Sequence, residues 1–259
     1  MSPVPASLAQ PRPLPQPFVE RPIAHRALHG PGRPENSRAA VRAALEHGYG
    51  IEIDIQPSAD GVPMVFHDEA LMRLTGEAGL VFERTAEELG RLGLKGGDEG
   101  IPMLADVLAL VAGRVPLLIE VKDQTGVLGP VDGRLEEAVA RALRGYEGPV
   151  ALMSFNPRSV IALRHLAPGV PRGLTTEAFQ PLHWPGVPEA LCERLREIPD
   201  YDTAGASFVS HDAADLSRPR VAELKAAGAR ILCWTIRSPA QEREARRVAE
   251  NVTFEGYLA

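Results

Sequence analysis

The sequence predicts a single α/β domain folded as a (β/α)8 barrel, the TIM barrel. Two observations predict it: short apolar segments alternate with amphipathic ones along most of the 259 residues, and charged residues recur where the apolar segments end. Strands that alternate with helices at this spacing are typical of a parallel sheet. Polar residues at the carboxyl ends of the strands are typical of barrel active sites. With 44% hydrophobic residues, a chain of this length can bury a core of that size.

Eight short apolar runs are the expected strands. They cover residues 22–27, 50–55, 116–122, 150–154, 172–175, 206–210, 230–235 and 251–254. Amphipathic stretches over 37–48, 134–145, 157–169, 218–228 and 238–250 are the expected helices. In the first of these, Ser37 can cap the start and Gly48 can end the helix. A doubly wound sheet is the alternative, but it predicts a GxGxxG loop after the first strand, and HRALHGPGRPENS has none.

Two kinds of segment interrupt the strand and helix pattern. Residues 1–21 are rich in proline and are expected to form an extended or disordered arm before a barrel domain at 22–259. The alternative for residues 17–21 is that Phe18 and Val19 plug the lower end of the barrel. Long excursions are expected at about 56–103, which contains the extra extended segment GVPMVFHD, and at 176–204. Loops of that length on a barrel usually shape access to the site.

Composition excludes several classes of protein. The net charge is −6 and no block of basic residues appears, which argues against a nucleic-acid partner. Cys192 and Cys233 form no CxxC pair, so neither a disulfide framework nor a thiolate zinc site is expected, and Cys233 reads as a core residue. No signal-peptide pattern and no bilayer-spanning apolar stretch is present. We therefore expect a cytoplasmic protein, with an oligomeric state that the sequence leaves open.

Three carboxylates are placed by two of the expected strands. Residues i and i+2 of a strand point to the same side, so Glu52 pairs with Asp54, and Glu120 pairs with Lys122. Buried charges are tolerated only when they are paired or bound to a metal. Three hard oxygen donors suit Mg²⁺ or Ca²⁺ better than zinc. An ion-pair network with Arg26 and Lys122 is the alternative to a metal site.

A series of short motifs runs through the sequence in a fixed order. It comprises HR at 25–26, PEN at 34–36, E-x-D at 52–54, DG at 60–61, HD at 67–68 and RLT at 73–75, followed by IPMLADVL, LLIEVK, SFNP and CWTI. Over nearly all of residues 23–254, this series resembles the glycerophosphodiester phosphodiesterase family. The resemblance implies a metal-dependent barrel that hydrolyses a small-molecule glycerophosphodiester to sn-glycerol 3-phosphate and an alcohol.

The resemblance also implies roles for particular residues. His25 and His67 would share the general acid and base duties, because imidazoles titrate near neutral pH, although either alone could be a structural histidine. Which of them is the acid stays open, as does attack by water or by the substrate's own 2-hydroxyl through a cyclic phosphate. Arg26 and Lys122 would hold the phosphate and Trp234 would pack on the glycerol. Glu35 and Asn36 either reach the site or close the loop before the helix. Five further histidines are given no role: His29, His47, His165, His183 and His211.

Three departures from the family pattern leave the head-group preference open. Ala27 stands where glycine is usual in HRG, Arg237 where asparagine is common, and TFEG replaces the usual TD-x-P. Two other functions remain as alternatives. One is a lysophospholipase D or phospholipase-like enzyme, which would need an exposed apolar rim around its site. The other is a barrel that binds ligand without turnover.

Overall fold

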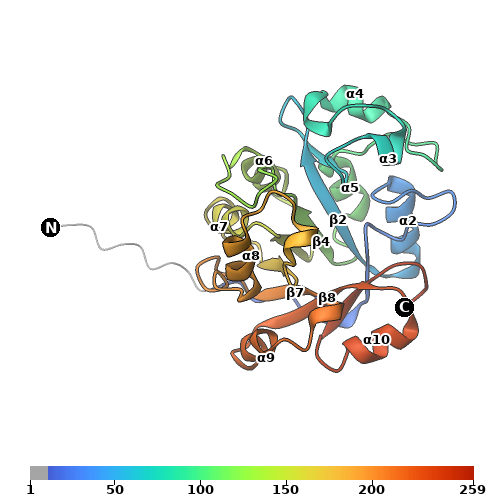
Figure 1. Cartoon of the computed structure of the whole chain (residues 1–259). Helices are drawn as coiled ribbons and strands as arrows, with labels where there is room; N and C mark the ends of the chain where they lie inside the picture. Colours follow the sequence, from blue (N-terminus) through green and yellow to red (C-terminus); the bar gives the residue numbers. More distant parts are fainter. Residues whose placement is uncertain (1–10) are drawn as a thin grey trace.

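The computed structural model describes residues 11–259 and confirms the predicted barrel (Figure 1). Eight parallel strands follow the order β1-β9-β8-β7-β6-β5-β4-β2, and β1 also pairs with β2, which closes the sheet. The strands are β1 Ile23–Ala24, β2 Gly50–Pro57, β4 Leu117–Val121, β5 Val150–Ser154, β6 Arg172–Thr176, β7 Phe208–Asp212, β8 Arg230–Ile236 and β9 Asn251–Phe254. Because the sheet closes on itself, the carboxyl ends of all eight strands meet at one face.

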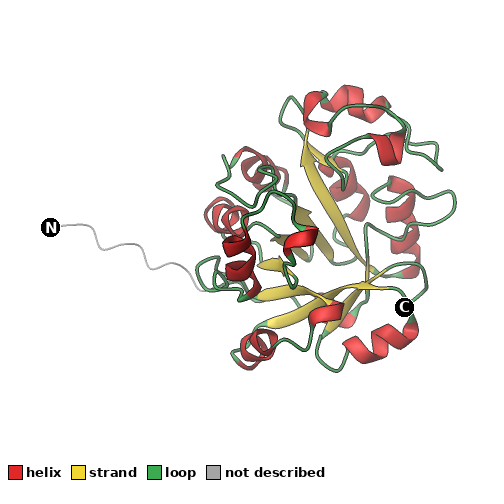
Figure 2. Cartoon of the chain, in the orientation of Figure 1, coloured by secondary structure: helices red, strands yellow, loops and turns green. Residues whose placement is uncertain are grey.

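Helices surround the barrel (Figure 2). They are α2 Arg38–His47, α5 Leu104–Val111, α6 Arg134–Ala142, α7 Pro157–Leu166, α8 Glu189–Arg196, α9 Pro219–Ala226 and α10 Pro239–Ala245. The first begins and ends where the sequence predicts. The Ser37 side chain accepts a hydrogen bond from the Ala40 amide, and Gly48 leaves the helix with a left-handed φ of 72°.

The amino-terminal end of the barrel interior is apolar and is closed by the segment before β1. Leu14 and Phe18, the latter in the short helix α1 Pro17–Glu20, are buried against inward-facing residues of the strands. The partners are Ile23, Leu118, Ala151, Met153, Phe208 and Leu232. The Asn251 side-chain amide also donates to the Phe18 carbonyl at 2.7 Å. The expectation of an extended or disordered arm is therefore wrong for this segment, and the alternative that Phe18 plugs the barrel holds. Residues 1–10 lie outside the described part of the chain.

Both long excursions fold into compact units with apolar contacts of their own. The first contains β3 Pro63–Val65, which pairs antiparallel with β2, followed by α3 Met72–Thr75, η1 Val81–Glu83 and α4 Ala86–Arg91. It extends beyond the end of β2, at the top of Figure 1. The second contains η2 Pro181–His183 and α8, and η3 Ala213–Asp215 follows β7. Within residues 11–259, no helix is both long enough and apolar enough to cross a bilayer.

Both cysteines are buried free thiols. Cys233 lies in the main apolar core, as its position in the run RILCWTI predicts. Burial raises the pKa of its thiol to about 12, so the side chain stays protonated near neutral pH. It therefore serves as a small core residue rather than as a nucleophile.

Candidate active site

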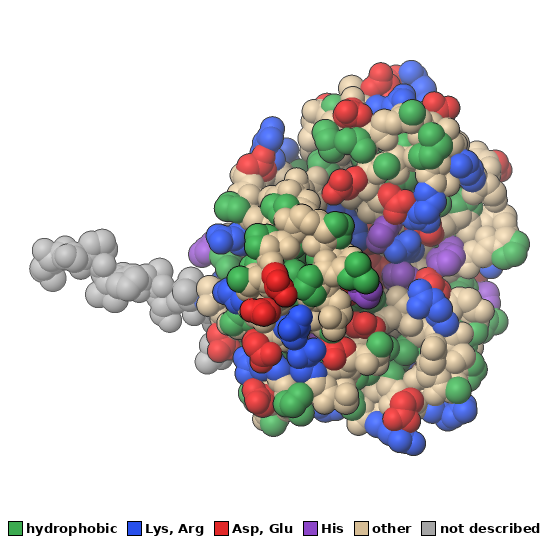
Figure 3. All heavy atoms as spheres, viewed as in Figure 1, with side chains coloured by type: hydrophobic (Ala, Val, Ile, Leu, Met, Phe, Trp, Pro, Cys, Tyr) green, Lys and Arg blue, Asp and Glu red, His purple; other side chains and the backbone are tan. Residues whose placement is uncertain are grey.

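A cavity of about 180 Å³ opens where the carboxyl ends of the strands meet. Eight residues singled out in the sequence line it: His25, Arg26, Glu52, Asp54, His67, Glu120, Lys122 and Trp234. Its other lining residues are Met153, Phe155, Ser210, Thr235, Arg237 and Thr253. In the space-filling view, histidine side chains lie beside acidic and basic side chains near the middle of one face (Figure 3). The fold thus brings together motifs that are spread over most of the sequence.

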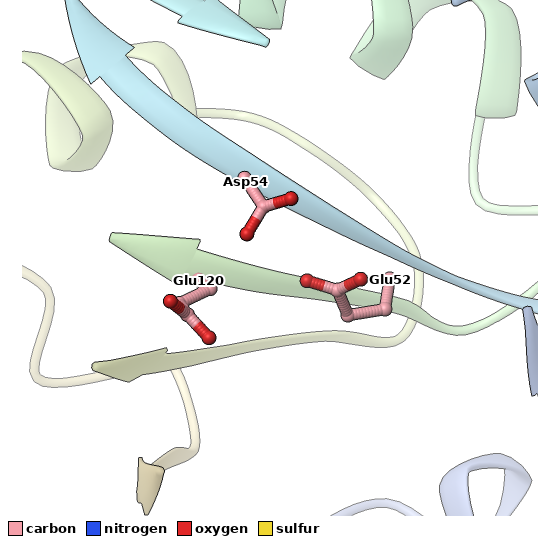
Figure 4. Close-up of side chains that lie close together, drawn as sticks. All are labelled: Glu52, Asp54 and Glu120. Atoms are coloured by element: carbon pink, nitrogen blue, oxygen red, sulfur yellow. The ribbon is translucent and has the colours of Figure 1, made fainter. Parts of the chain in front are cut away.

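Three carboxylates gather beside β2 and β4 (Figure 4). Glu52, Asp54 and Glu120 are only 2%, 2% and 6% exposed. Each offers an oxygen within 4.8 Å of the others. The parallel register of β2 and β4 sets Asp54 beside Glu120, and strand alternation turns Glu52 to the same side. This arrangement can hold a metal ion.

Two basic side chains lie against part of this group. The Lys122 ammonium is 2.7 Å from Glu120 Oε1 and 3.1 Å from Asp54 Oδ1. Arg26 Nε is 3.6 Å from Asp54 Oδ2. Burial alone would raise the pKa of Asp54, but the charges of Lys122 and His67 outweigh it and hold that pKa below its usual range. Asp54 is therefore ionised.

Glu52 lacks such compensation. Its Oε2 accepts a hydrogen bond from the Arg26 backbone amide at 2.8 Å, but no ion pair joins it to a basic side chain among residues 11–259. Burial, followed by the charges of Asp54 and Glu120, raises its pKa well above the usual range. The ion pairs thus compensate the negative charges of Asp54 and Glu120 but not the charge of Glu52. A hard divalent cation fits the donor set, because it would compensate all three carboxylates at once.

His25 is held by a carboxylate that the sequence analysis did not single out. Its Nδ1 lies 2.6 Å from Glu255 Oε2, and Arg237 Nε donates to the other oxygen of Glu255 at 2.8 Å. Burial lowers the pKa of His25, and the hydrogen bond that its ring donates to Glu255 opposes that shift. His29, which was given no role, also approaches this carboxylate: its Nε2 is 3.5 Å from Glu255 Oε2. Glu255 is therefore a positioning residue for His25.

A chain of hydrogen bonds links the second histidine to Arg26. His67 Nδ1 lies 2.7 Å from Asp68 Oδ1, so neighbours in sequence do make direct contact. Arg73 donates to Asp68 at 2.5 and 2.8 Å and to Glu35 at 2.7 and 2.9 Å. Glu35 in turn accepts from Arg26 Nη1 at 2.8 Å. Glu35 does not line the cavity itself but fixes a side chain that does.

Asn36 also contacts the site from the loop before α2. Its buried side-chain amide donates to Asp54 Oδ2 at 2.9 Å. The backbone amide of Ala27 donates to the Glu52 carbonyl at 2.9 Å. To make these contacts, Arg26, Ala27 and Asn36 adopt left-handed φ angles of 51°, 63° and 57°. Such angles favour glycine, so Ala27 keeps the backbone shape that the usual glycine would adopt more easily.

An apolar wall completes the cavity. The Trp234 indole donates to the Ser210 carbonyl at 3.0 Å, and its ring centroid is 5.5 Å from that of Phe155. None of the five histidines without an assigned role lines this cavity: His29, His47, His165, His183 and His211. His211 is buried and hydrogen-bonded to Thr176 Oγ1 at 2.7 Å. Its Nε2 lies 3.2 Å from Asp215 Oδ2, so both ring nitrogens have partners outside the cavity.

Sequence relatives agree with the motif series. The model of the glycerophosphoryl diester phosphodiesterase family matches residues 25–252. A glycerophosphodiester phosphodiesterase of Caldanaerobacter subterraneus is 35% identical over 161 residues, which are 59% of this chain and 65% of the relative. One from Bacillus altitudinis is 33% identical over 163 residues, with 60% and 65% covered. The matched segments thus span slightly less than two thirds of these two relatives.

Solved structures extend the likeness to nearly the whole fold. An Oleispira antarctica phosphodiesterase in complex with the product sn-glycerol-3-phosphate superposes with a TM-score of 0.76 at 25% identity, covering 92% of this chain and 93% of that one. A glycerophosphodiester phosphodiesterase from Agrobacterium tumefaciens gives 0.66 at 26% identity, covering 90% and 94%. The barrel fold, the ordered motifs and the match to the family model agree. The chain therefore belongs to the glycerophosphoryl diester phosphodiesterase family.

Proposed function

We propose that the protein hydrolyses glycerophosphodiesters to sn-glycerol 3-phosphate and an alcohol, with a divalent cation. The observation that carries the proposal is one cavity that holds three buried carboxylates, two basic side chains and two histidines. The sn-glycerol-3-phosphate bound in the Oleispira antarctica structure supports the same substrate class.

Charge in the cavity suits a phosphate diester. Glu52, Asp54 and Glu120 would hold Mg²⁺ or Ca²⁺, which when bound polarises phosphoryl oxygens and lowers the pKa of a bound hydroxyl or water. Arg26 and Lys122 supply positive charge for the phosphate. The Nε of Arg26 is buried 3.6 Å from Asp54 Oδ2 and makes no hydrogen bond among the described residues, which supports a role in binding a phosphate oxygen.

The two histidines would carry the protons. Cleavage of the P–O bond needs one group to take a proton from the attacking hydroxyl and another to give a proton to the departing alkoxide. His25 and His67 each have Nδ1 engaged by a carboxylate, Glu255 or Asp68, which leaves Nε2 for this exchange. The attacking hydroxyl belongs either to water or to the substrate's 2-position.

Release of sn-glycerol 3-phosphate from glycerophosphocholine tests the proposal. We expect turnover that EDTA abolishes and that added Mg²⁺ or Ca²⁺ restores. Glu52→Gln should lose most of the activity and remain folded. Glu136→Gln is the matched control, because Glu136 is equally buried at 2% but lies in α6, away from the cavity. Full turnover by the EDTA-treated enzyme would rule out the metal requirement.

One observation favours a second candidate, a lysophospholipase D activity. Such an enzyme needs an apolar rim, and the large exposed side chains Met72, Phe82 and Leu182 all lie in the two excursions. Phe179 and Trp184 in the second excursion contribute less, since Phe179 is buried and Trp184 is half-buried. Lysophosphatidylcholine assayed beside glycerophosphocholine separates the two activities. A barrel that only binds ligand would turn over neither.

A further inference from the structure

Two buried hydroxyl groups in the cavity have no hydrogen-bond partner. Ser210 in β7 and Thr253 in β9 both line the cavity and are 0% and 1% exposed. Neither Ser210 Oγ nor Thr253 Oγ1 has a partner among the described residues. Buried hydroxyls in proteins are almost always hydrogen-bonded, because leaving them unpaired is costly. In a cavity built for a ligand, such groups indicate where the ligand's polar atoms lie.

The two hydroxyls lie on the strands on either side of the strand that carries an aromatic ring. Strand β8 lies between β7 and β9 in the barrel and carries Trp234. The indole N–H donates to the Ser210 carbonyl at 3.0 Å, which fixes the ring beside β7. The wall therefore presents a hydroxyl, an indole and a second hydroxyl. Of these strands, β7 and β8 lie across the barrel from β2 and β4, which carry the three carboxylates, and β9 is separated from β2 by β1.

This pattern matches a short polyol. A glycerol unit has C–H groups that can pack on an indole and hydroxyl groups that both donate and accept hydrogen bonds. We infer that Ser210 and Thr253 bind the two free hydroxyl groups of the substrate's glycerol unit, with Trp234 packed on its carbon chain. The inference rests on the proposed function, since it assigns residues to one part of that substrate.

Burial favours the glycerol over the departing alcohol as the occupant. Ser210 and Thr253 are closed off from solvent, whereas the Arg237 side chain, which also lines the cavity, is 61% exposed. The glycerol is common to all substrates of this class, while the alcohol varies. A closed wall suits the constant part, and the open side accepts the variable part.

A substrate series can test this assignment without disturbing the reacting groups. Glycerophosphocholine is compared with 2-hydroxypropyl phosphocholine, which lacks only the terminal hydroxyl and keeps the 2-hydroxyl. A site built to pair with a hydroxyl discriminates strongly against an analogue that lacks it, because its own polar group is then left unpaired. We therefore expect the wild-type protein to prefer glycerophosphocholine.

The variants Ser210→Ala and Thr253→Val then locate each contact. Each should lower kcat/KM for glycerophosphocholine by about fivefold to tenfold, the usual effect of one hydrogen bond. For the residue that binds the terminal hydroxyl, the loss should disappear with 2-hydroxypropyl phosphocholine. For the other residue, the loss should persist with both substrates. Thr253→Val preserves shape, and melting temperatures check that both variants fold.

Ser159→Ala is the matched control. Ser159 in α7 is also fully buried with an unpartnered hydroxyl, but it does not line the cavity. It should leave the kinetics of both substrates unchanged. The inference is overturned if both Ser210→Ala and Thr253→Val behave like Ser159→Ala. It is also overturned if each of the two variants lowers kcat/KM by the same factor with both substrates, because the hydroxyls would then bind water or serve packing. If the wild-type protein does not hydrolyse glycerophosphocholine at all, the proposed function fails as well.

Discussion

The two ends of the barrel interior differ in chemistry although the same strands build both. At the amino-terminal end, Leu118 and Phe208 face inward and pack on Phe18. Two residues further along the same strands, Glu120 and Ser210 line the catalytic cavity. Side chains two apart in a strand share a face. Moving two residues along a strand therefore leads from the apolar core to the catalytic cavity. Stability and activity should therefore respond to different substitutions.

The cavity end also departs from the rules that stabilise the other end. It buries three carboxylates together, raises the pKa of Glu52, and places Arg26 and Ala27 in left-handed conformations. Such departures are expected at functional sites and are offset by packing elsewhere. Substitutions at this end should then reduce activity with little loss of stability, and some should even stabilise the fold.

The largest effect on activity is expected at the histidines. His25→Ala and His67→Ala should each lower kcat by on the order of 10²–10⁴-fold, because each removes an acid or base from proton transfer. The double variant should be scarcely worse than the more damaging single one, since the two act as a unit. Steady-state kinetics and thermal melts measure this. His165→Ala, at an exposed position of α7, is the neutral control. Wild-type kcat in His67→Ala would remove His67 from the mechanism.

The opposite pattern is expected at the other end of the barrel. Phe18→Ala leaves a cavity among Ile23, Leu118 and Phe208, and should lower the free energy of unfolding by about 3–5 kcal/mol. Well below its melting temperature, the variant should keep kcat near the wild-type value. Denaturant unfolding and kinetics check both points. Phe82→Ala, where the side chain is 49% exposed, is the control. A large loss of kcat in folded Phe18→Ala would show that the two ends are coupled.

The same strand alternation explains which features could be predicted from sequence. It placed Glu52 with Asp54 and Glu120 with Lys122, and the alternation of strands and helices predicted the barrel. The plug at Phe18 could be given only as an alternative, because the position of this segment depends on partners such as Asn251, 233 residues away. No local pattern in a proline-rich segment indicates that contact. Glu255 was missed, although it follows Thr253 by two residues and the same rule would have turned it inward.

A smaller effect is expected when the charge on Glu255 is removed. Burial lowers the pKa of His25 and the Glu255 hydrogen bond raises it, so Glu255→Gln should lower the pKa of His25 further. The carboxylate also stabilises the imidazolium form, through which His25 passes whether it donates or accepts a proton. Removing the charge should therefore lower kcat by about tenfold or somewhat more, the usual cost of a charged hydrogen bond.

NMR titration of the His25 imidazole measures this shift directly. Glu244→Gln is the control, because Glu244 is exposed and pairs with Arg247 rather than with a histidine. An unchanged pKa of His25 in Glu255→Gln would contradict the positioning role. A shift without any change in kcat would mean that the protonation of His25 does not limit turnover.

The smallest effect is expected from removing residues 1–10. A chain that starts at residue 11 keeps Leu14 and Phe18, which fill the amino-terminal end of the barrel. Its kcat/KM should stay within about threefold of the full chain, or about 0.7 kcal/mol in barrier height. A chain that starts at residue 22 lacks both side chains and should melt at a markedly lower temperature. If instead the chain from residue 11 loses most of its activity, residues 1–10 contribute to the site, and the division between a catalytic end and a purely stabilising end must be redrawn.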